Sequence, residues 1–127
     1  MKFTFKREKN RLNIFQKLKA TLRLREAINK ADNAHNNSGE RYYVMPTSGT
    51  SGDLIIMDRA NFRKLKQKGY ISRSIYTRDL ERECFYCTPY RNGSGELHPD
   101  ILSLKREQYF SWVAATIKAR KNEKEKK

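Results

Sequence analysis

The chain has 127 residues, of which 37% are hydrophobic and 33% are charged, so we expect one small domain with a modest core. No run of about 18 apolar residues is present, which excludes a transmembrane helix, and two cysteines are too few for a disulfide framework. The net charge of +14 attracts polyanions, namely nucleic acid, an anionic membrane face or an acidic protein. The basic N-terminus lacks the apolar segment of a secretory signal, and we expect a cytoplasmic protein.

The charge is distributed in alternating blocks. Three blocks are basic, with net charges of +8 for residues 1–30, +6 for residues 59–76 and +5 for residues 101–127. Between them lie two mildly acidic blocks, with −3 for residues 31–58 and −2 for residues 77–100. The second basic block contains no acidic residue, which makes it the best candidate for contact with a polyanion.

The first predicted element is a helix over residues 11–37, which contain no Gly or Pro and many strong helix formers. Gly39 is suited to a left-handed cap at the end of this helix. The apolar residues occupy two faces rotated by about 90°, one with Phe15, Leu18 and Leu22 and one with Leu24, Ile28 and Ala31. A broad buried face, or a break near residues 22–24, would account for both faces.

The cluster TSGTSG at residues 47–52 resembles the phosphate-binding loop of the adenylate-forming enzymes. The continuation departs from that family, because Asp53 follows in place of the family's Pro-Lys-Gly, and no Gly-Lys-Ser/Thr of a Walker A motif is present. The flanking residues 41–46 and 53–58 are rich in β-branched and aromatic residues. We therefore expect a β-hairpin connected by this cluster, not a nucleotide site.

The second half of the chain predicts two further helices. Asp58 is a suitable N-cap for a helix over residues 59–68, and Gly69 is suited to its end. Pro99 stands near the first position of the last helix, whose apolar stripe contains Leu102, Tyr109, Phe110, Val113 and Ile117. Between these helices we expect an extended segment (70–76), a short helix (77–83), a strand or extended loop (84–90) and a turn (91–95).

These elements predict a small single α+β domain in which a β-hairpin packs against two or three helices, with basic segments at both termini. The domain is expected to span residues 11–119. Residues 1–10 form a basic N-terminal segment. Residues 120–127 contain no apolar residue, which predicts a charged, disordered tail.

Cys84 and Cys87 form a CxxC pair, which raises the question of a metal or redox site. A structural zinc site needs four ligands, and the two histidines, His35 and His98, lie far from the pair in sequence. The Thr-Pro that follows the pair argues against the helix of a redox CxxC. We expect inert, half-buried cysteines on opposite faces of a strand, with no metal and no cofactor. No spacing of acidic residues or histidines suggests a catalytic group, which favours a protein that is not an enzyme.

The basic blocks favour nucleic acid, because Lys and Arg on an exposed helix neutralise phosphates and each contact releases a counterion. Aromatic residues interleaved with arginines in residues 70–91 suit the stacking of unpaired bases. We therefore predict a non-enzymatic accessory protein that binds DNA or RNA. The residues predicted to contact phosphates are Arg59, Arg63, Lys64, Lys66, Lys68 and Arg73, with Lys17, Lys19, Arg23 and Arg25 as a second surface.

Two other partner classes stay open. A basic face also suits an acidic protein partner, so the chain is alternatively a protein-interaction module or an inhibitor. An anionic membrane surface is the third class. It is suggested by the cations of residues 1–25 and the neighbouring apolar residues Phe3, Phe5, Leu12, Ile14 and Phe15.

The run from residue 41 to residue 91, above all MDRANFRKLKQKGYISR and ECFYCTPYRNG, resembles small basic proteins of gut bacteria and their phages or mobile elements. This run covers about two-fifths of the chain. The resemblance implies a prokaryotic, cytoplasmic setting. It implies no activity, because none is established for those proteins.

Overall fold

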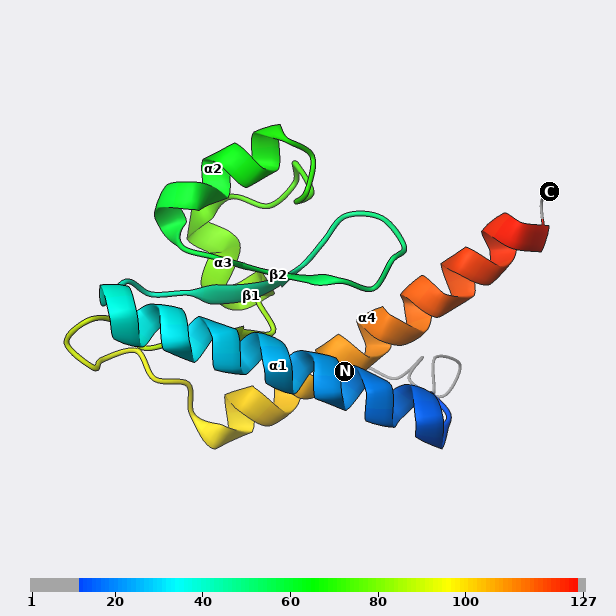
Figure 1. The fold of residues 1–127 in the computed structure, drawn as a ribbon, viewed down its shortest axis with the longest axis horizontal. Helices are drawn as coiled ribbons and strands as arrows, with labels where there is room; N and C mark the ends of the chain where they lie inside the picture. Colours follow the sequence, from blue (N-terminus) through cyan, green and yellow to red (C-terminus); the bar gives the residue numbers. More distant parts are fainter. Residues whose placement is uncertain (1–11, 126–127) are drawn as a thin grey trace, which may run out of the picture.

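The structure is a computed structural model that describes residues 12–125 (Figure 1). It is a small α+β domain, as the sequence predicts. The predicted N-terminal segment, residues 1–10, lies outside the described residues. In chain order the elements are α1 (Ile14–Ser38), β1 (Tyr43–Pro46), β2 (Leu54–Met57), α2 (Arg59–Gln67), the 3-10 helix η2 (Thr77–Asp79), α3 (Leu80–Glu83), β3 (Tyr86–Cys87) and α4 (Pro99–Glu125).

Three antiparallel strands form one sheet in the order β2-β1-β3. Strands β1 and β2 are the predicted hairpin, in which Val44 lies opposite Ile56. Residues 47–53 connect them, and the backbone N–H of Thr47 donates to the carbonyl of Asp53 at 3.3 Å across the base of this connection. The TSGTSG cluster is therefore a hairpin connection, as predicted. Strand β3 adds a short third strand on the other side of β1.

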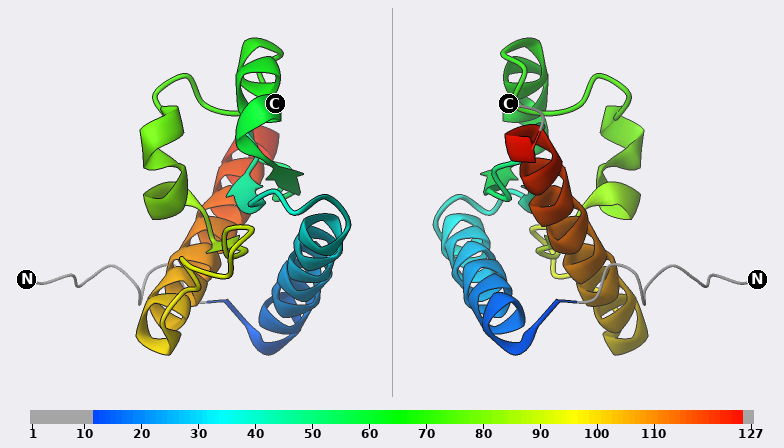
Figure 2. Two further views of the ribbon diagram at one scale, coloured as in Figure 1. Left: turned by 90° about the vertical axis from the view of Figure 1, so that its left-hand side faces the viewer. Right: turned by 90° about the vertical axis from the view of Figure 1, so that its right-hand side faces the viewer.

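Helices cover both faces of the sheet, with α1 and α4 on one side and α2 and α3 on the other (Figures 1 and 2). Because side chains alternate along a strand, Tyr43 and Met45 face α2 whereas Val44 faces α1. The core beneath α2 also contains Phe62, and the core beneath α1 contains Tyr109. In the described part of the chain four helices surround the sheet, rather than the two or three expected.

Helix α1 begins at a capping box, in which the Asn13 side chain accepts from the Gln16 N–H at 2.8 Å and the Gln16 side chain accepts from the Asn13 N–H at 3.0 Å. The helix ends at Gly39, whose φ of 81° confirms the predicted left-handed cap. The residues that α1 buries against the rest of the domain are Ala20, Leu24, Ala27 and Ala31.

Only one of the two apolar faces of α1 is buried. Phe15, Leu18 and Leu22 are 82%, 57% and 48% exposed. The helix is continuous from Ile14 to Ser38, so neither the expected broad buried face nor the expected break is present. The small alanines let the other face approach the sheet and α4, and none of the described elements covers the face of Phe15.

Helix α2 begins at Asp58, as predicted, because the Asp58 carboxylate accepts from the Asn61 N–H at 2.9 Å. Gly69 follows the helix with a φ of 86°. Residues 70–76 form an irregular segment instead of the expected extended one, because the N–H of Ile75 donates to the carbonyl of Ser72 at 3.2 Å and closes a turn.

Helix α4 also begins as predicted, with Pro99 in its first turn. The His98 ring accepts from the Asp100 N–H at 3.1 Å, which satisfies a free donor of that turn. Tyr109 of the predicted stripe is fully buried, but the buried face departs from the stripe at its start, since Leu102 is exposed and Lys105 is 5% exposed. Among the described residues, no helix has the length and apolar character needed to cross a bilayer.

The end of α4 corrects the prediction of a disordered tail over residues 120–127. The helix continues to Glu125, and only the last two residues lie outside the description. Residues 120–125 consist mainly of Lys, Arg and Glu, which are strong helix formers. Such residues extend a helix that is already nucleated, even where no core contact holds them.

Candidate functional site

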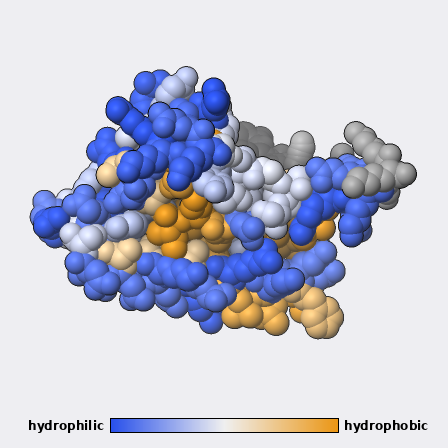
Figure 3. Space-filling view, turned by 45° about the horizontal axis from the view of Figure 1, so that its top comes forward, coloured by the Kyte–Doolittle hydropathy of each residue, from blue (hydrophilic) through white to orange (hydrophobic). Residues whose placement is uncertain are grey.

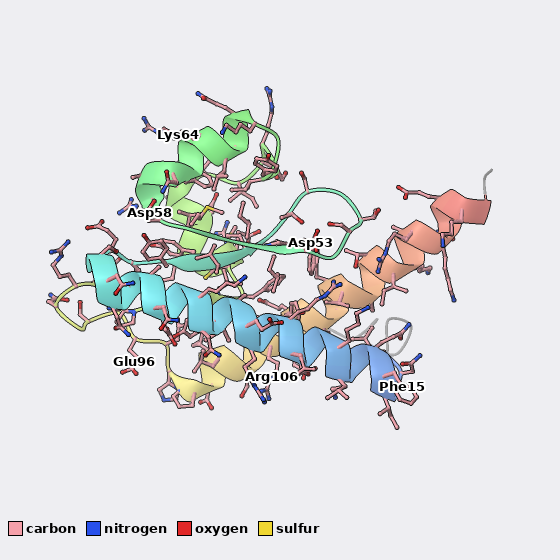
Figure 4. All side chains as sticks on the ribbon, in the orientation of Figure 1. Phe15, Asp53, Asp58, Lys64, Glu96 and Arg106 are labelled. Atoms are coloured by element: carbon pink, nitrogen blue, oxygen red, sulfur yellow. The ribbon has the colours of Figure 1, made fainter. Side chains whose placement is uncertain are left out.

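Helix α2 presents a basic face to solvent. We call it the α2 surface and define it by Arg59, Arg63, Lys64, Lys68 and, from the loop that follows, Arg73. All five side chains are exposed, and Lys64 marks their position in Figure 4. None of the salt bridges found among the described residues involves them. The α2 surface is therefore a patch of cations that residues 12–125 leave without a salt bridge.

Lys66, which we predicted to bind together with these residues, points inward. Its Nζ donates to the carbonyl of Ile75 at 2.7 Å and lies 4.4 Å from the centre of the Tyr76 ring. One turn separates Lys66 from the buried Phe62, so both lie on the inner side of α2. The ammonium of Lys66 therefore helps to hold residues 70–76 against the helix, and it lies apart from the five exposed cations of the α2 surface.

The aromatic residues expected to stack on bases lie in two different environments. Phe85 is 7% exposed, and the Tyr86 hydroxyl donates to Asp32 at 2.7 Å, so these two belong to the core. The exposed fraction is 51% for Tyr70, 51% for Tyr76 and 43% for Tyr90. Only the latter three present ring surface to a ligand.

A second basic site lies between α1, the hairpin connection and α4. It is a hollow of about 250 Å³, into which Lys19 and Arg23 of α1 and Arg120 of α4 project. Gln16 and Gly52 also line it, and no acidic side chain is found among the described lining residues. Since a water molecule occupies about 30 Å³, this hollow has room for a phosphate group and several waters. We call it the α1–α4 hollow.

Buried contacts fix the walls of this hollow. The Tyr109 hydroxyl donates to the carbonyl of Ala20 at 2.7 Å and so ties α4 to α1. Gly52 has a φ of 81°, and a Cβ at this position would lie 3.5 Å from Nη1 of Arg23. A contact of that length is an ordinary one, so the left-handed turn is what favours glycine at this position.

The second predicted surface is divided among three places. At about 100° per residue, positions two apart on a helix point in nearly opposite directions. Lys19 and Arg23, which are four apart, both line the hollow. Lys17 instead lies over the Phe110 ring, with its Nζ 5.3 Å from the ring centre, and Arg25 is exposed on the outer side of α1.

Arg120 completes the hollow, and sequence reasoning missed it. The residue falls in the segment predicted to be disordered, so it was not considered as part of a folded site. The available signal was the uninterrupted run of helix formers after Ile117, with no Gly or Pro to end the helix. A helix extended to Glu125 carries Arg120 alongside the first half of α1.

Cys84 and Cys87 lie together in the core beneath α2, which corrects the expectation of half-buried residues on opposite faces. Their exposed fractions are 0% and 2%. Cys84 ends α3 and precedes a strand of only two residues, so strand alternation does not separate the pair. The buried Arg41 donates from Nη2 to Sγ of Cys87 at 3.0 Å and to Glu81 at 2.9 Å.

The two thiols have different proton affinities. The pKa of Cys87 is lowered to about 7, because the neighbouring Cys84 thiol and the Arg41 guanidinium both favour the Cys87 thiolate, although burial acts in the opposite sense. The pKa of Cys84 is raised, because the adjacent Cys87 and burial both disfavour a thiolate at Cys84, whose thiol donates to the carbonyl of Glu81 at 3.3 Å. Within residues 12–125, no group of three or more His, Cys, Asp or Glu side chains gathers as a metal-binding cluster.

Comparison with known proteins gives no precedent for these sites. No protein-family model, no curated protein and no solved structure matches the chain. The charge and geometry of the α2 surface and the α1–α4 hollow are therefore the features that bear on the function of the chain.

Proposed function

We propose that the chain is a non-enzymatic accessory protein that binds DNA or RNA through its phosphates, with the α1–α4 hollow as the principal contact. One observation carries the proposal: Lys19, Arg23 and Arg120 converge from two helices on a single hollow whose described lining contains no acid. Three cations that line one hollow attract an anion more strongly than a single cation does. Arginine suits this role, because its planar donors match the oxygens of a phosphate.

The α2 surface supports the same function as a separate contact. It belongs to the layer on the other side of the sheet from α1, so one phosphate cannot touch both sites. Its five cations are exposed along a convex helix and the loop after it. Tyr70 exposes about half of its surface on that loop and offers a flat face to an unpaired base, whereas Lys66 and Arg78 already lie over the Tyr76 ring. These features favour a single-stranded ligand at this second contact.

Charge reversal tests the hollow directly. The variant Lys19→Glu, Arg23→Glu, Arg120→Glu changes only exposed side chains, so we expect it to stay folded by circular dichroism. The matched control Lys30→Glu, Arg106→Glu, Lys118→Glu has the same net charge and leaves the hollow intact. We expect the first variant to bind a labelled oligonucleotide at least about tenfold more weakly than the control, since each lost phosphate contact removes a counterion-release term.

Two results would contradict the proposal. Equal weakening in both variants would mean that net charge, and not the hollow, attracts the ligand. Absence of any shift of labelled DNA or RNA by the wild-type chain, together with capture of a defined acidic protein, would favour the protein-interaction module instead. A third variant, Arg63→Glu, Lys64→Glu, Lys68→Glu, measures the α2 surface separately, with Lys66 left in place because it holds the loop.

A further inference from the structure

The outer side of α1 carries a strip of large apolar side chains, which we define by Ile14, Phe15, Leu18 and Leu22. Ile14 and Phe15 are each 82% exposed, the highest values among the exposed large hydrophobic residues of the described chain. Figure 4 shows Phe15 pointing away from the rest of the molecule, and Figure 3 shows apolar atoms gathered at the end where α1 begins. The strip is not part of either core.

The geometry of α1 separates this strip from the buried side of the helix. At about 100° per residue, Phe15, Leu18 and Leu22 fall within about 60° of one another, on the opposite side of the helix from Leu24 and Ala27. The buried side of α1 therefore holds the domain together, while the outer strip projects as a narrow convex ridge. A convex ridge is the wrong shape for a small ligand, which needs a concave site.

Positive charge accompanies the strip. Residues 12–25 contain four cations and no acidic residue. Two of these cations, Lys19 and Arg25, lie beside the strip on either edge when the helix is viewed end-on. Large apolar side chains flanked by Lys and Arg on one helix face are the combination that lies in a membrane interface and favours anionic lipids.

We propose that the outer strip of α1 docks on an anionic phospholipid surface, with the four apolar side chains entering the interface and Lys19 and Arg25 contacting headgroups. Charge complementarity favours this partner, because Lys19 and Arg25 flank the strip, residues 12–25 contain no acidic residue before Glu26, and the whole chain carries +14. The convex shape of the strip is also compatible with docking on lipid, since a lipid interface deforms around a protruding helix. This inference goes beyond nucleic-acid binding, and Lys19 is the residue that the strip shares with the α1–α4 hollow.

Vesicle sedimentation tests the strip, with a control that separates insertion from charge. The test variant is Phe15→Gln, Leu18→Gln. The control is Ile101→Gln, Leu104→Gln, which removes two exposed apolar residues of α4, 42% and 55% exposed, and keeps every charge. At about 0.15 M salt, where distant charges are screened, we expect the test variant to partition about tenfold or more weakly into phosphatidylserine-containing vesicles. The control is expected to partition like the wild type.

A second readout reports insertion itself. In Phe15→Trp, tryptophan emission should shift to shorter wavelength when phosphatidylserine-containing vesicles are added, whereas Leu104→Trp should give only the background of Trp112. Wild-type partitioning that is unaffected by Phe15→Gln, Leu18→Gln, or that is equal on pure phosphatidylcholine, would overturn the proposal. So would a wild-type dimer in sedimentation velocity that the same variant converts to monomer, because the strip would then bind a second copy of the chain.

Discussion

Replacement of Lys105 by Met is the sharpest test of how the domain is held together. Lys105 is 5% exposed, and its Nζ donates to the carbonyls of Glu81, Arg82 and Cys84 at 2.7, 3.3 and 2.8 Å. These carbonyls end α3, so a side chain of α4 satisfies acceptors that the short helix leaves free. Methionine fills a similar volume but donates no hydrogen bond.

Two of the three bonds are short, and hydrogen bonds from a charged donor are each worth about 1.5–3 kcal/mol. The variant no longer buries an ammonium group, which offsets part of this loss. We therefore expect the free energy of unfolding to fall by about 3 kcal/mol, a loss that a domain of ordinary stability survives. With an m-value of about 1.5 kcal/mol per molar urea, the unfolding midpoint should fall by about 2 M.

The control Lys118→Met alters an exposed lysine of the same helix and should change stability by less than about 0.5 kcal/mol. Equal midpoints for the two variants would refute the role of Lys105.

Three further predictions concern the cap of α2 and the cysteine pair. Asp58→Ala should lower the free energy of unfolding by about 1 kcal/mol in urea titrations, because the N-cap bond is lost; an unchanged midpoint would argue against the cap. The variant Cys84→Ser, Cys87→Ser should stay folded by circular dichroism at a cost of about 1–3 kcal/mol; stoichiometric zinc in the wild type together with unfolding of this variant would show a metal site instead. Because the native pKa of Cys87 is about 7 and the ordinary value is 9.0, the native thiol releases its proton first. The Cys87 thiolate should therefore raise the free energy of unfolding as the pH increases from about 7 to about 9, and this contribution should be absent below about pH 7. The variant Cys87→Ser should show no such increase between about pH 7 and about pH 9.

The features that the sequence predicts well are decided by neighbouring residues. Asp58 caps a helix whose free N–H groups are two and three residues away, and Gly39 supplies a left-handed turn that other residues avoid. The hairpin follows from two short apolar segments around a Gly, Ser and Thr cluster. Each of these features depends on residues close together in the sequence and not on which helix or strand packs against them.

The features that the sequence does not predict depend on distant partners. The two apolar faces of α1 have similar hydrophobic residues, so the sequence of the helix does not show which face is buried. The position of the sheet and α4 decides that Leu24 is buried and Phe15 is exposed. The same holds for the buried cations. Arg41 is inward because the carbonyls of Thr88 and Gly95 lie there to accept from it, and Lys105 is inward because of the end of α3.

The candidate site was predicted only in part for the same reason. Charge counting identified the exposed cations of α2 and the two hollow residues Lys19 and Arg23. It grouped Lys66 with the exposed cations, whereas this ammonium donates to the carbonyl of Ile75, nine residues later, on the inner side of α2. It also missed Arg120, because the contribution of α4 to the hollow becomes visible only when the two helices are packed.

The salt dependence of oligonucleotide binding is the most direct test of the proposed function. The logarithm of the binding constant should fall linearly with the logarithm of salt concentration, and the slope counts the phosphates that the protein neutralises. Loss of three contacts in Lys19→Glu, Arg23→Glu, Arg120→Glu should make the slope shallower by about 2 on a single strand and by nearly 3 on a duplex. The charge-matched control Lys30→Glu, Arg106→Glu, Lys118→Glu should keep the wild-type slope. Identical slopes for the hollow variant and the wild type would contradict phosphate binding in the α1–α4 hollow.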